Sequence, residues 1–284
     1  MAAVASRGPA TSGGPDRPAA ARAVPLSWWD PALREFRYWL TNYRRTWRGS
    51  IYSSVLNPVL YLAAMGIGLG KLVDAHGLAH LGGVSYLAFL APGLLAASAM
   101  QTAMSESTYP VLGSVKWRKT YYAAASTPMR PADIFHGHLL FTTMRLAMNS
   151  AIFLAVMAAF GAVRSPWALA TIGVGTLTGL AFAAPLEAWA VTLTNGQSFA
   201  MVFRFGMIPL FLFSGTFFPI TQLPVWARPL AYATPLWHGV ALSRALSLGT
   251  ATLGGALVHI GYLAALAAIG IALGNRSYRR RLYV

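Results

Sequence analysis

Charged residues inside long apolar segments are informative, because a charge is costly there. Glu106 and Glu187 are acids and Arg145 is a base, and each belongs to a different apolar segment. Antiparallel packing of the segments would bring Arg145 within reach of either acid. We therefore expect an intramembrane charge network, which acts either as a salt bridge that locks the bundle or as a direct contact for a transported molecule.

The histidines do not form the pattern of a metal site or a catalytic triad. His136 and His138 lie about 200° apart on a helix, and only Asp133 is near them in sequence. His238 and His259 have no acid beside them in sequence, and the chain has no cysteine to act as a metal ligand or nucleophile. We expect no resident metal and no catalytic residues, so the chain is not expected to be an enzyme.

A nucleotide site would need a glycine-rich loop whose backbone amides cradle phosphates, as in GxxxxGK[ST]. The nearest string ends at Leu72, but Met65 stands where the first glycine belongs, and Leu72 replaces the hydroxyl that would bind magnesium. The string also ends an apolar segment instead of following a soluble strand. This chain is therefore expected to hold no cofactor, and any ATP and Mg²⁺ would be bound by a partner subunit.

The composition indicates that the ionisable residues above lie on membrane-spanning helices. The chain is 56% hydrophobic and only 10% charged, whereas soluble domains have about 25% charged residues. Its apolar blocks are near the 20 residues that a helix needs to cross a bilayer, and the alternation of a membrane β-barrel is absent. Although the net charge is +15, the basic residues flank apolar blocks, so they predict contact with lipid headgroups and not with nucleic acid.

The chain is thus predicted to be an all-α integral membrane protein with a six-span domain over residues 50–276. A disordered cytoplasmic tail is expected at 1–29 and a basic cytoplasmic tail at 277–284. The predicted spans are 51–70, 85–107, 135–160, 168–192, 199–218 and 252–274.

An amphipathic helix is predicted over 30–49, before the first span. Asp30 suits a helix cap and Pro31 suits the first helical position. The apolar side chains recur at three- and four-residue steps, and arginines fill much of the remaining surface, which is typical of a helix lying in the membrane interface. An ordinary surface helix is the alternative. The apolar positions are Leu33, Phe36, Leu40, Tyr43 and Trp47.

Lysine and arginine are concentrated on the side of the spans that holds both termini, and the other side holds few. This bias predicts cytoplasmic termini and a multi-pass protein of the inner (cytoplasmic) membrane. The proline-rich, apolar segment 219–251 then lies outside and is expected to fold back into the membrane as broken, re-entrant helices. The connection 108–134 lies inside, and its aromatic and basic residues would suit docking of a partner. These docking residues are Lys116, Trp117, Arg118, Lys119, Tyr121 and Tyr122.

Two stretches resemble the membrane subunits of type 2 ABC exporters. The first begins at Phe213 and reads FSGTFFP. It continues with Leu223 and Pro224 and ends with His238 and Arg244. In that family it marks the fifth span and a re-entrant external gate. The residues that it assigns to the gate are Ser214, Gly215, Phe217, Phe218, Pro219, Pro224, Pro235, His238 and Arg244.

The second stretch, KTYYAAASTP over 119–128 followed by Asp133 and Gly137, is similar to the cytoplasmic connection of permeases for nodulation-factor lipo-oligosaccharides and, more distantly, of daunorubicin-type drug exporters. The resemblance covers roughly residues 30–280. It implies a permease that pairs with a second copy of itself or a similar permease and with cytoplasmic ATP-binding cassette ATPases.

The implied function is outward export of an amphipathic, lipo-oligosaccharide or glycolipid-like substrate. The main alternative is multidrug or antibiotic efflux by the same architecture. A proton-coupled carrier would depend on Glu106, Arg145 and Glu187 alone, and a membrane-embedded enzyme would need more clustered polar residues than the chain offers.

Overall fold

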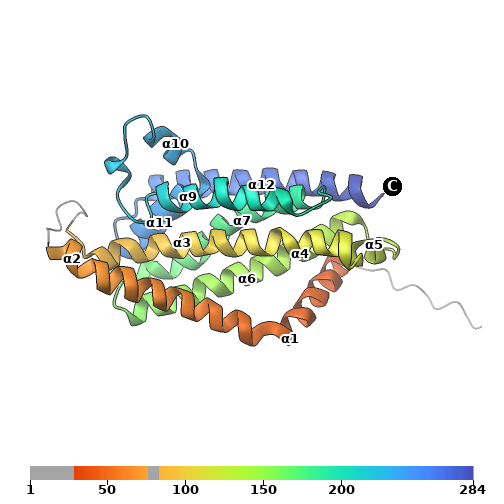
Figure 1. Ribbon diagram of the computed structural model, residues 1–284, viewed down its shortest axis with the longest axis horizontal. Coiled ribbons are helices and arrows are strands. Elements are labelled where there is room, and N and C mark those ends of the chain that lie inside the picture. Colours follow the sequence, from red (N-terminus) through yellow and green to blue (C-terminus); the bar gives the residue numbers. More distant parts are fainter. Residues whose placement is uncertain (1–28, 76–82, 284) are drawn as a thin grey trace, which may run out of the picture.

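The computed structural model describes residues 29–75 and 83–283. The predicted tail over 1–29 therefore lies outside the described residues, apart from Trp29. Throughout the described part, every regular element is a helix. Figure 1 shows an elongated bundle with α5, the start of α1 and the C-terminus at one end, and with α2 and α10 toward the other. We call the first of these the basic end and the second the re-entrant end.

Within residues 29–75 and 83–283, five helical runs are long and apolar enough to cross a membrane. The first is α1 (Asp30–Tyr61), which continues through a π-helical stretch (Leu62–Leu69) into α2 (Gly70–Ala75). The second is α3 (Tyr86–Ser107), followed by α4 (Tyr109–Leu112) and a π-helical turn (Gly113–Trp117). The others are α6 (Pro131–Ala159), α7 (Thr171–Ala190) with its preceding 3-10 turn (Pro166–Ala170), and α12 (Leu253–Leu282). The fold is that of an all-α, multi-pass membrane protein.

The sixth expected span, 199–218, is a shorter helical run over Gln197–Phe213. It consists of α8 (Gln197–Met201), a π-helical turn (Val202–Met207) and α9 (Ile208–Phe213). At 1.5 Å per residue this run is about 25 Å long, less than the roughly 30 Å of the hydrocarbon core. The chain leaves the helix at Ser214, and Gly215 follows with a positive φ of 82°.

The expected boundary between an interfacial helix and the first span, near residue 50, does not occur. The helix α1 runs through it without interruption, although Figure 1 shows a marked bend between its first turns, which slant toward α5, and its long remainder. Gly49 lies at this point of the helix, and one glycine in a helix costs only about 1 kcal/mol. The predicted lipid-facing stripe also needs correction, because Phe36 and Tyr43 pack against the protein core while Trp47 is exposed.

Helix α1 can approach α6 closely because Gly137 has no side chain. A Cβ at this position would lie 2.5 Å from the Ala32 carbonyl oxygen and 2.5 Å from the Glu35 Cβ. Any larger residue would force the two helices apart. Gly137, which belongs to the second stretch of resemblance, therefore has a packing role in this fold.

The C-terminal boundary also differs from the prediction. Residues 277–282, expected in a tail, extend α12 because Tyr278 and Leu282 are buried in the core at the basic end. The connection 108–134 is mostly helical too, since it contains α4, the π-helical turn and α5 (Thr120–Ala125).

The segment 219–251 consists of short helices that begin near its prolines. They are a 3-10 turn (Ile220–Gln222), α10 (Arg228–Tyr232) and α11 (Pro235–Leu248). Helix α11 has 14 residues and is about 21 Å long, so it does not cross the bilayer alone. It packs against α3, α7 and α12, which places the end of this segment inside the bundle.

Candidate functional site

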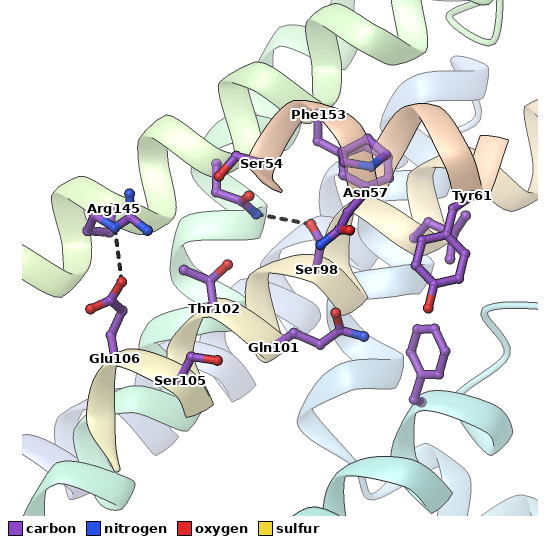
Figure 2. A pocket seen from close by; sticks show the side chains of 14 residues that line it. Ser54, Asn57, Tyr61, Ser98, Gln101, Thr102, Ser105, Glu106, Arg145 and Phe153 are labelled. Carbon is purple, nitrogen blue, oxygen red and sulfur yellow. Dashed lines mark hydrogen bonds and ion pairs between the residues drawn. The ribbon is translucent and has the colours of Figure 1, made fainter. Parts of the chain in front are cut away.

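A cavity of about 250 Å³ lies between α1, α3, α6 and the side of α9 (Figure 2). Its walls carry hydroxyl, amide and charged side chains, which is unusual in a bundle built from apolar helices. The polar lining residues are Ser54, Asn57, Tyr61, Ser98, Gln101, Thr102, Ser105, Glu106, Arg145 and Asn149. Leu94, Phe153 and Phe211 add apolar surface.

The helical repeat explains why these residues meet. On α6, Arg145, Asn149 and Phe153 are four residues apart and form one stripe. Ser98, Gln101, Thr102 and Ser105 follow three- and four-residue steps along α3, and Ser54, Asn57 and Tyr61 do so along α1. Each helix thus turns its polar stripe toward the same space.

An ion pair closes one part of this cavity. The Arg145 Nε donates to Glu106 Oε1 over 3.0 Å, and the side chains are only 11% and 19% exposed. The guanidinium carbon also lies 4.5 Å from the centre of the Tyr43 ring. Arg145 Nη1 is buried and has no hydrogen-bond partner in the described structure. Because the nitrogen is buried, a ligand would reach it only if neighbouring side chains moved.

A neutral hydrogen bond links the same two helices further along the cavity. Asn149 Nδ2 donates to Ser98 Oγ over 3.1 Å, and Ser98 Oγ donates to the Leu95 carbonyl over 2.9 Å. Hydroxyls and amides both donate and accept. The cavity therefore suits a ligand that is rich in hydroxyl or amide groups, and its lining contains no histidine or cysteine to act as a base or nucleophile.

The structure separates Glu187 from the ion pair, so the expected three-residue network needs correction. Glu187 is fully buried and accepts hydrogen bonds from Ser107 Oγ at 3.3 Å and Thr142 Oγ1 at 3.1 Å. Thr142 faces α7, whereas Arg145 on the same helix faces α3. Sites three residues apart on a helix differ by about 60° in direction, which is sufficient to give the two acids different partners.

Near Glu187, His138 Nδ1 lies 2.8 Å from Tyr121 Oη and 3.8 Å from Glu187 Oε2. His138 also stacks on Trp39, with ring centres 4.3 Å apart. His136 points elsewhere, since its Nε2 lies 2.8 Å from Asn275 Oδ1. The two histidines thus serve different contacts, and no group of three or more metal-ligating side chains occurs in residues 29–75 and 83–283.

The residues expected to dock a partner divide into exposed and buried ones. Trp117 is 62% exposed, and Lys116 Nζ donates to the Thr194 carbonyl over 2.7 Å. Tyr121 is fully buried, so it cannot serve as a docking anchor. Its ring packs 5.7 Å from that of Tyr278, and burial raises the pKa of the Tyr121 hydroxyl well above its usual value. The hydroxyl therefore remains a neutral partner for His138.

The other docking residues lie around the same turn. Arg118 Nη2 lies 3.3 Å from Ser114 Oγ, and its guanidinium lies 5.5 Å from the Trp39 ring centre. Lys119 adopts a positive φ of 53°, and Tyr122 is half-buried. An exposed, basic and aromatic surface thus remains at the basic end without Tyr121.

Arg244 brings much of the expected gate together at the re-entrant end. Its Nε donates to the Phe89 carbonyl and its Nη2 to the Gly215 carbonyl, each over 2.9 Å. Its guanidinium also lies 3.7 Å from the Phe89 ring centre. Ser214 and Thr216 share a 2.9 Å hydrogen bond beside it. One arginine therefore fixes the turn after α9 to α3.

The remaining gate residues have separate positions. Phe217 packs against Phe211 with ring centres 5.0 Å apart, and Phe211 lies 6.3 Å from Tyr61, so aromatic rings connect the cavity to the turn. His238 Nδ1 lies 2.9 Å from His259 Nδ1. Phe218 packs with Ile220. The short helices of this segment begin at or near the expected prolines, which are Pro219, Pro224 and Pro235.

Sequence reasoning found the ion pair but missed the rest of the cavity. The missed residues on α3 and α6 carry a usable signal, because polar side chains recur at three- and four-residue steps inside apolar spans. Glu106 and Arg145 extend the polar stripes of Ser98 and Asn149. The contribution of α1 has no comparable signal, since Ser54 and Asn57 lie next to a span boundary that was itself misplaced.

Comparison with known proteins gives a consistent result. The family model for the ABC-2 type transporter matches residues 34–248. The chain is 32% identical over 252 residues to nodulation protein J of Rhizobium leguminosarum bv. trifolii, covering 86% of this chain and 94% of that protein. It is 28% identical over 267 residues to nodulation protein J of Rhizobium meliloti strain 1021, covering 92% and 97%. The chain therefore belongs to the ABC-2 type transporter family and is a membrane permease subunit of an ABC exporter.

Proposed function

We propose that this permease exports an amphipathic molecule of the lipo-oligosaccharide or glycolipid class. The observation that carries this proposal is the polar cavity between α1, α3 and α6. An oligosaccharide headgroup offers many hydroxyl and amide groups, and these match the Ser, Thr, Asn and Gln side chains of the lining. The ion pair adds charge-assisted hydrogen bonds, which are roughly twice as strong as neutral ones.

The size and position of the cavity suit a headgroup and not a whole glycolipid. Its volume of about 250 Å³ is slightly below the roughly 300–1,000 Å³ of typical ligand pockets. Ser105 at its edge is exposed, so the cavity opens at the side of the chain. An acyl chain attached to the headgroup would remain in lipid or against a second permease subunit.

The aromatic rings of Tyr61, Phe211 and Phe217 suggest the direction of exit. They lead from the cavity to the turn after α9, which Arg244 fixes to α3. We propose that displacement of these rings opens the path toward the re-entrant end. That end then faces outward, and the basic end with both termini faces the cytoplasm across the inner membrane.

Energy would come from separate ATP-binding cassette ATPase subunits that bind ATP and Mg²⁺. The surface around Trp117, Lys116 and Arg118 at the basic end supports this arrangement, because aromatic and arginine side chains are enriched in interfaces. The permease would act with a second copy of itself or with a similar permease.

A second candidate substrate is a hydrophobic drug. A pocket of about 550 Å³ lies between α9 and the segment 223–234, and its walls are almost entirely apolar, with Phe213, Trp226 and Leu230 among them. Such a pocket would suit a compact apolar molecule better than an oligosaccharide.

Stimulation of ATP hydrolysis distinguishes the two substrates. The permease is purified together with its ATPase, reconstituted in lipid, and assayed with a lipo-oligosaccharide, its deacylated oligosaccharide and a panel of hydrophobic drugs. We expect the lipo-oligosaccharide to stimulate hydrolysis most. Stimulation by drugs but not by the lipo-oligosaccharide would replace the first proposal with the second.

A further inference from the structure

A second cavity, of about 350 Å³, lies at the basic end, away from the cavity of Figure 2. The beginning of α1, the beginning of α6 and the last turns of α12 surround it. Its principal side chains are Trp29, Arg130, His136, Asn275, Arg279 and Tyr283. We propose that this cavity binds the phosphate of an anionic phospholipid.

The charge balance of the cavity is positive. Its one acid, Asp133, is 7% exposed and accepts from the Arg130 backbone nitrogen at 2.9 Å, from Nε at 3.1 Å and from Nη2 at 2.9 Å. That acid is therefore already compensated. Arg279 is exposed and forms no ion pair within the described residues. A phosphate can supply the missing negative charge.

The cavity also offers several hydrogen-bond donors. The His136–Asn275 contact uses Asn275 Oδ1, which leaves the Asn275 amide nitrogen to donate to a ligand. The side chain of Arg130 is 63% exposed, and its contacts with Asp133 leave part of its five donors for another acceptor. Together with Arg279, these groups match the several acceptor oxygens of a phosphate.

The depth of the cavity favours a lipid over a soluble anion. Asn275 directly follows the apolar part of α12, so the cavity begins where the hydrocarbon core ends. Trp29 and Tyr283 border it, and these two residue types are enriched at the headgroup level of membranes. A phospholipid would place its phosphate among the cations and its acyl chains beside α12. This proposal does not depend on which molecule the permease exports.

Native mass spectrometry of the full-length permease tests the assignment. The protein is purified from nanodiscs that contain phosphatidylglycerol or phosphatidylcholine, and the retained lipids are counted. We expect selective retention of phosphatidylglycerol and about tenfold weaker retention in Arg279→Gln, since a charged hydrogen-bonding group is lost. Arg280→Gln is the matched control, because it removes the same charge from the neighbouring residue, which does not line the cavity.

Two further arms make the test decisive. Arg279→Lys keeps the charge but not the two-pronged geometry, so we expect intermediate retention, which also shows that position 279 tolerates substitution. Inorganic phosphate is added to protein in phosphatidylcholine to detect binding of a free anion. Equal losses in Arg279→Gln and Arg280→Gln, or no loss in either, would overturn the site. Tight binding of inorganic phosphate without lipid selectivity would overturn the lipid as its occupant.

Discussion

Arg145 on α6 donates to Glu106 on α3 over 3.0 Å, and it leaves its Nη1 buried without a partner in the described structure. The pair thus has two properties that are usually separate. It joins two helices of the bundle, and both of its members line the polar cavity.

Removing both members of the Arg145–Glu106 pair should destabilise the protein less than the sum of the two single removals. Arg145→Gln or Glu106→Gln leaves one charge in a largely desolvated position, and the double variant leaves none. We expect a coupling energy of about 1–3 kcal/mol in a double-mutant cycle, measured as detergent-solubilised stability. The cycle of Arg145 with Glu187 serves as the control and should be additive. Additivity in the Glu106 cycle would refute the pairing as a source of stability.

Trp117 and Tyr121 should respond differently to substitution, although they are only four residues apart. Trp117→Ala removes an exposed aromatic side chain and should reduce recovery of the ATPase in a quantitative pull-down from membranes with matched expression. Tyr121→Phe removes only the buried hydroxyl that contacts His138, so recovery should be unchanged while stability falls by about 1 kcal/mol. Loss of the ATPase in Tyr121→Phe with normal recovery in Trp117→Ala would argue against this division.

Arg244 should determine the order of the turn after α9. Arg244→Met removes hydrogen bonds to the Phe89 and Gly215 carbonyls, and limited proteolysis should then cut faster near 214–219. Arg164→Gln is a suitable control, since this exposed arginine lies near the same end and its side chain makes no hydrogen bond or ion pair with the turn in the described structure. Unchanged protection in Arg244→Met would show that the turn is held by its apolar packing alone.

Single cysteines can report the orientation because the chain has none of its own. Arg280→Cys at the basic end should react with an impermeant maleimide only after cells are permeabilised. Thr221→Cys, exposed at the re-entrant end, should react in intact cells. The reverse labelling pattern would invert the proposed topology and, with it, the direction assigned to the export path.

The apolar blocks were sufficient to predict most of the long helices. The span expected at 168–192 corresponds closely to the helical run 166–190, and the span expected at 135–160 to α6. Hydropathy is a sum over many residues, so a few polar side chains do not change the prediction. The span expected at 199–218 is the exception, because the helical run there is Gln197–Phe213, only 17 residues long, and the chain turns at Ser214.

Side-chain partners were harder to predict because they depend on the direction of each helical face. The sequence placed Arg145 near either acid, but it could not show that Thr142 turns toward Glu187 while Arg145 turns toward Glu106. For Tyr121 the same limit applied. It directly follows Arg118, Lys119 and Thr120 in sequence, so its burial against Tyr278, more than 150 residues later, has no local signal.

The most direct test of the proposed substrate site is ATP-dependent transport in proteoliposomes that contain the permease and its ATPase. A fluorescent lipo-oligosaccharide is followed in wild type, Asn149→Ala and Thr143→Ala, of which only Asn149 lines the cavity. Because one neutral hydrogen bond contributes about 0.5–1.5 kcal/mol, we expect the Asn149→Ala rate to fall by about two- to tenfold at low substrate. Thr143→Ala should match wild type. Equal rates in all three proteins, or no ATP-dependent movement of the lipo-oligosaccharide by wild type, would contradict the assignment of this cavity to its headgroup.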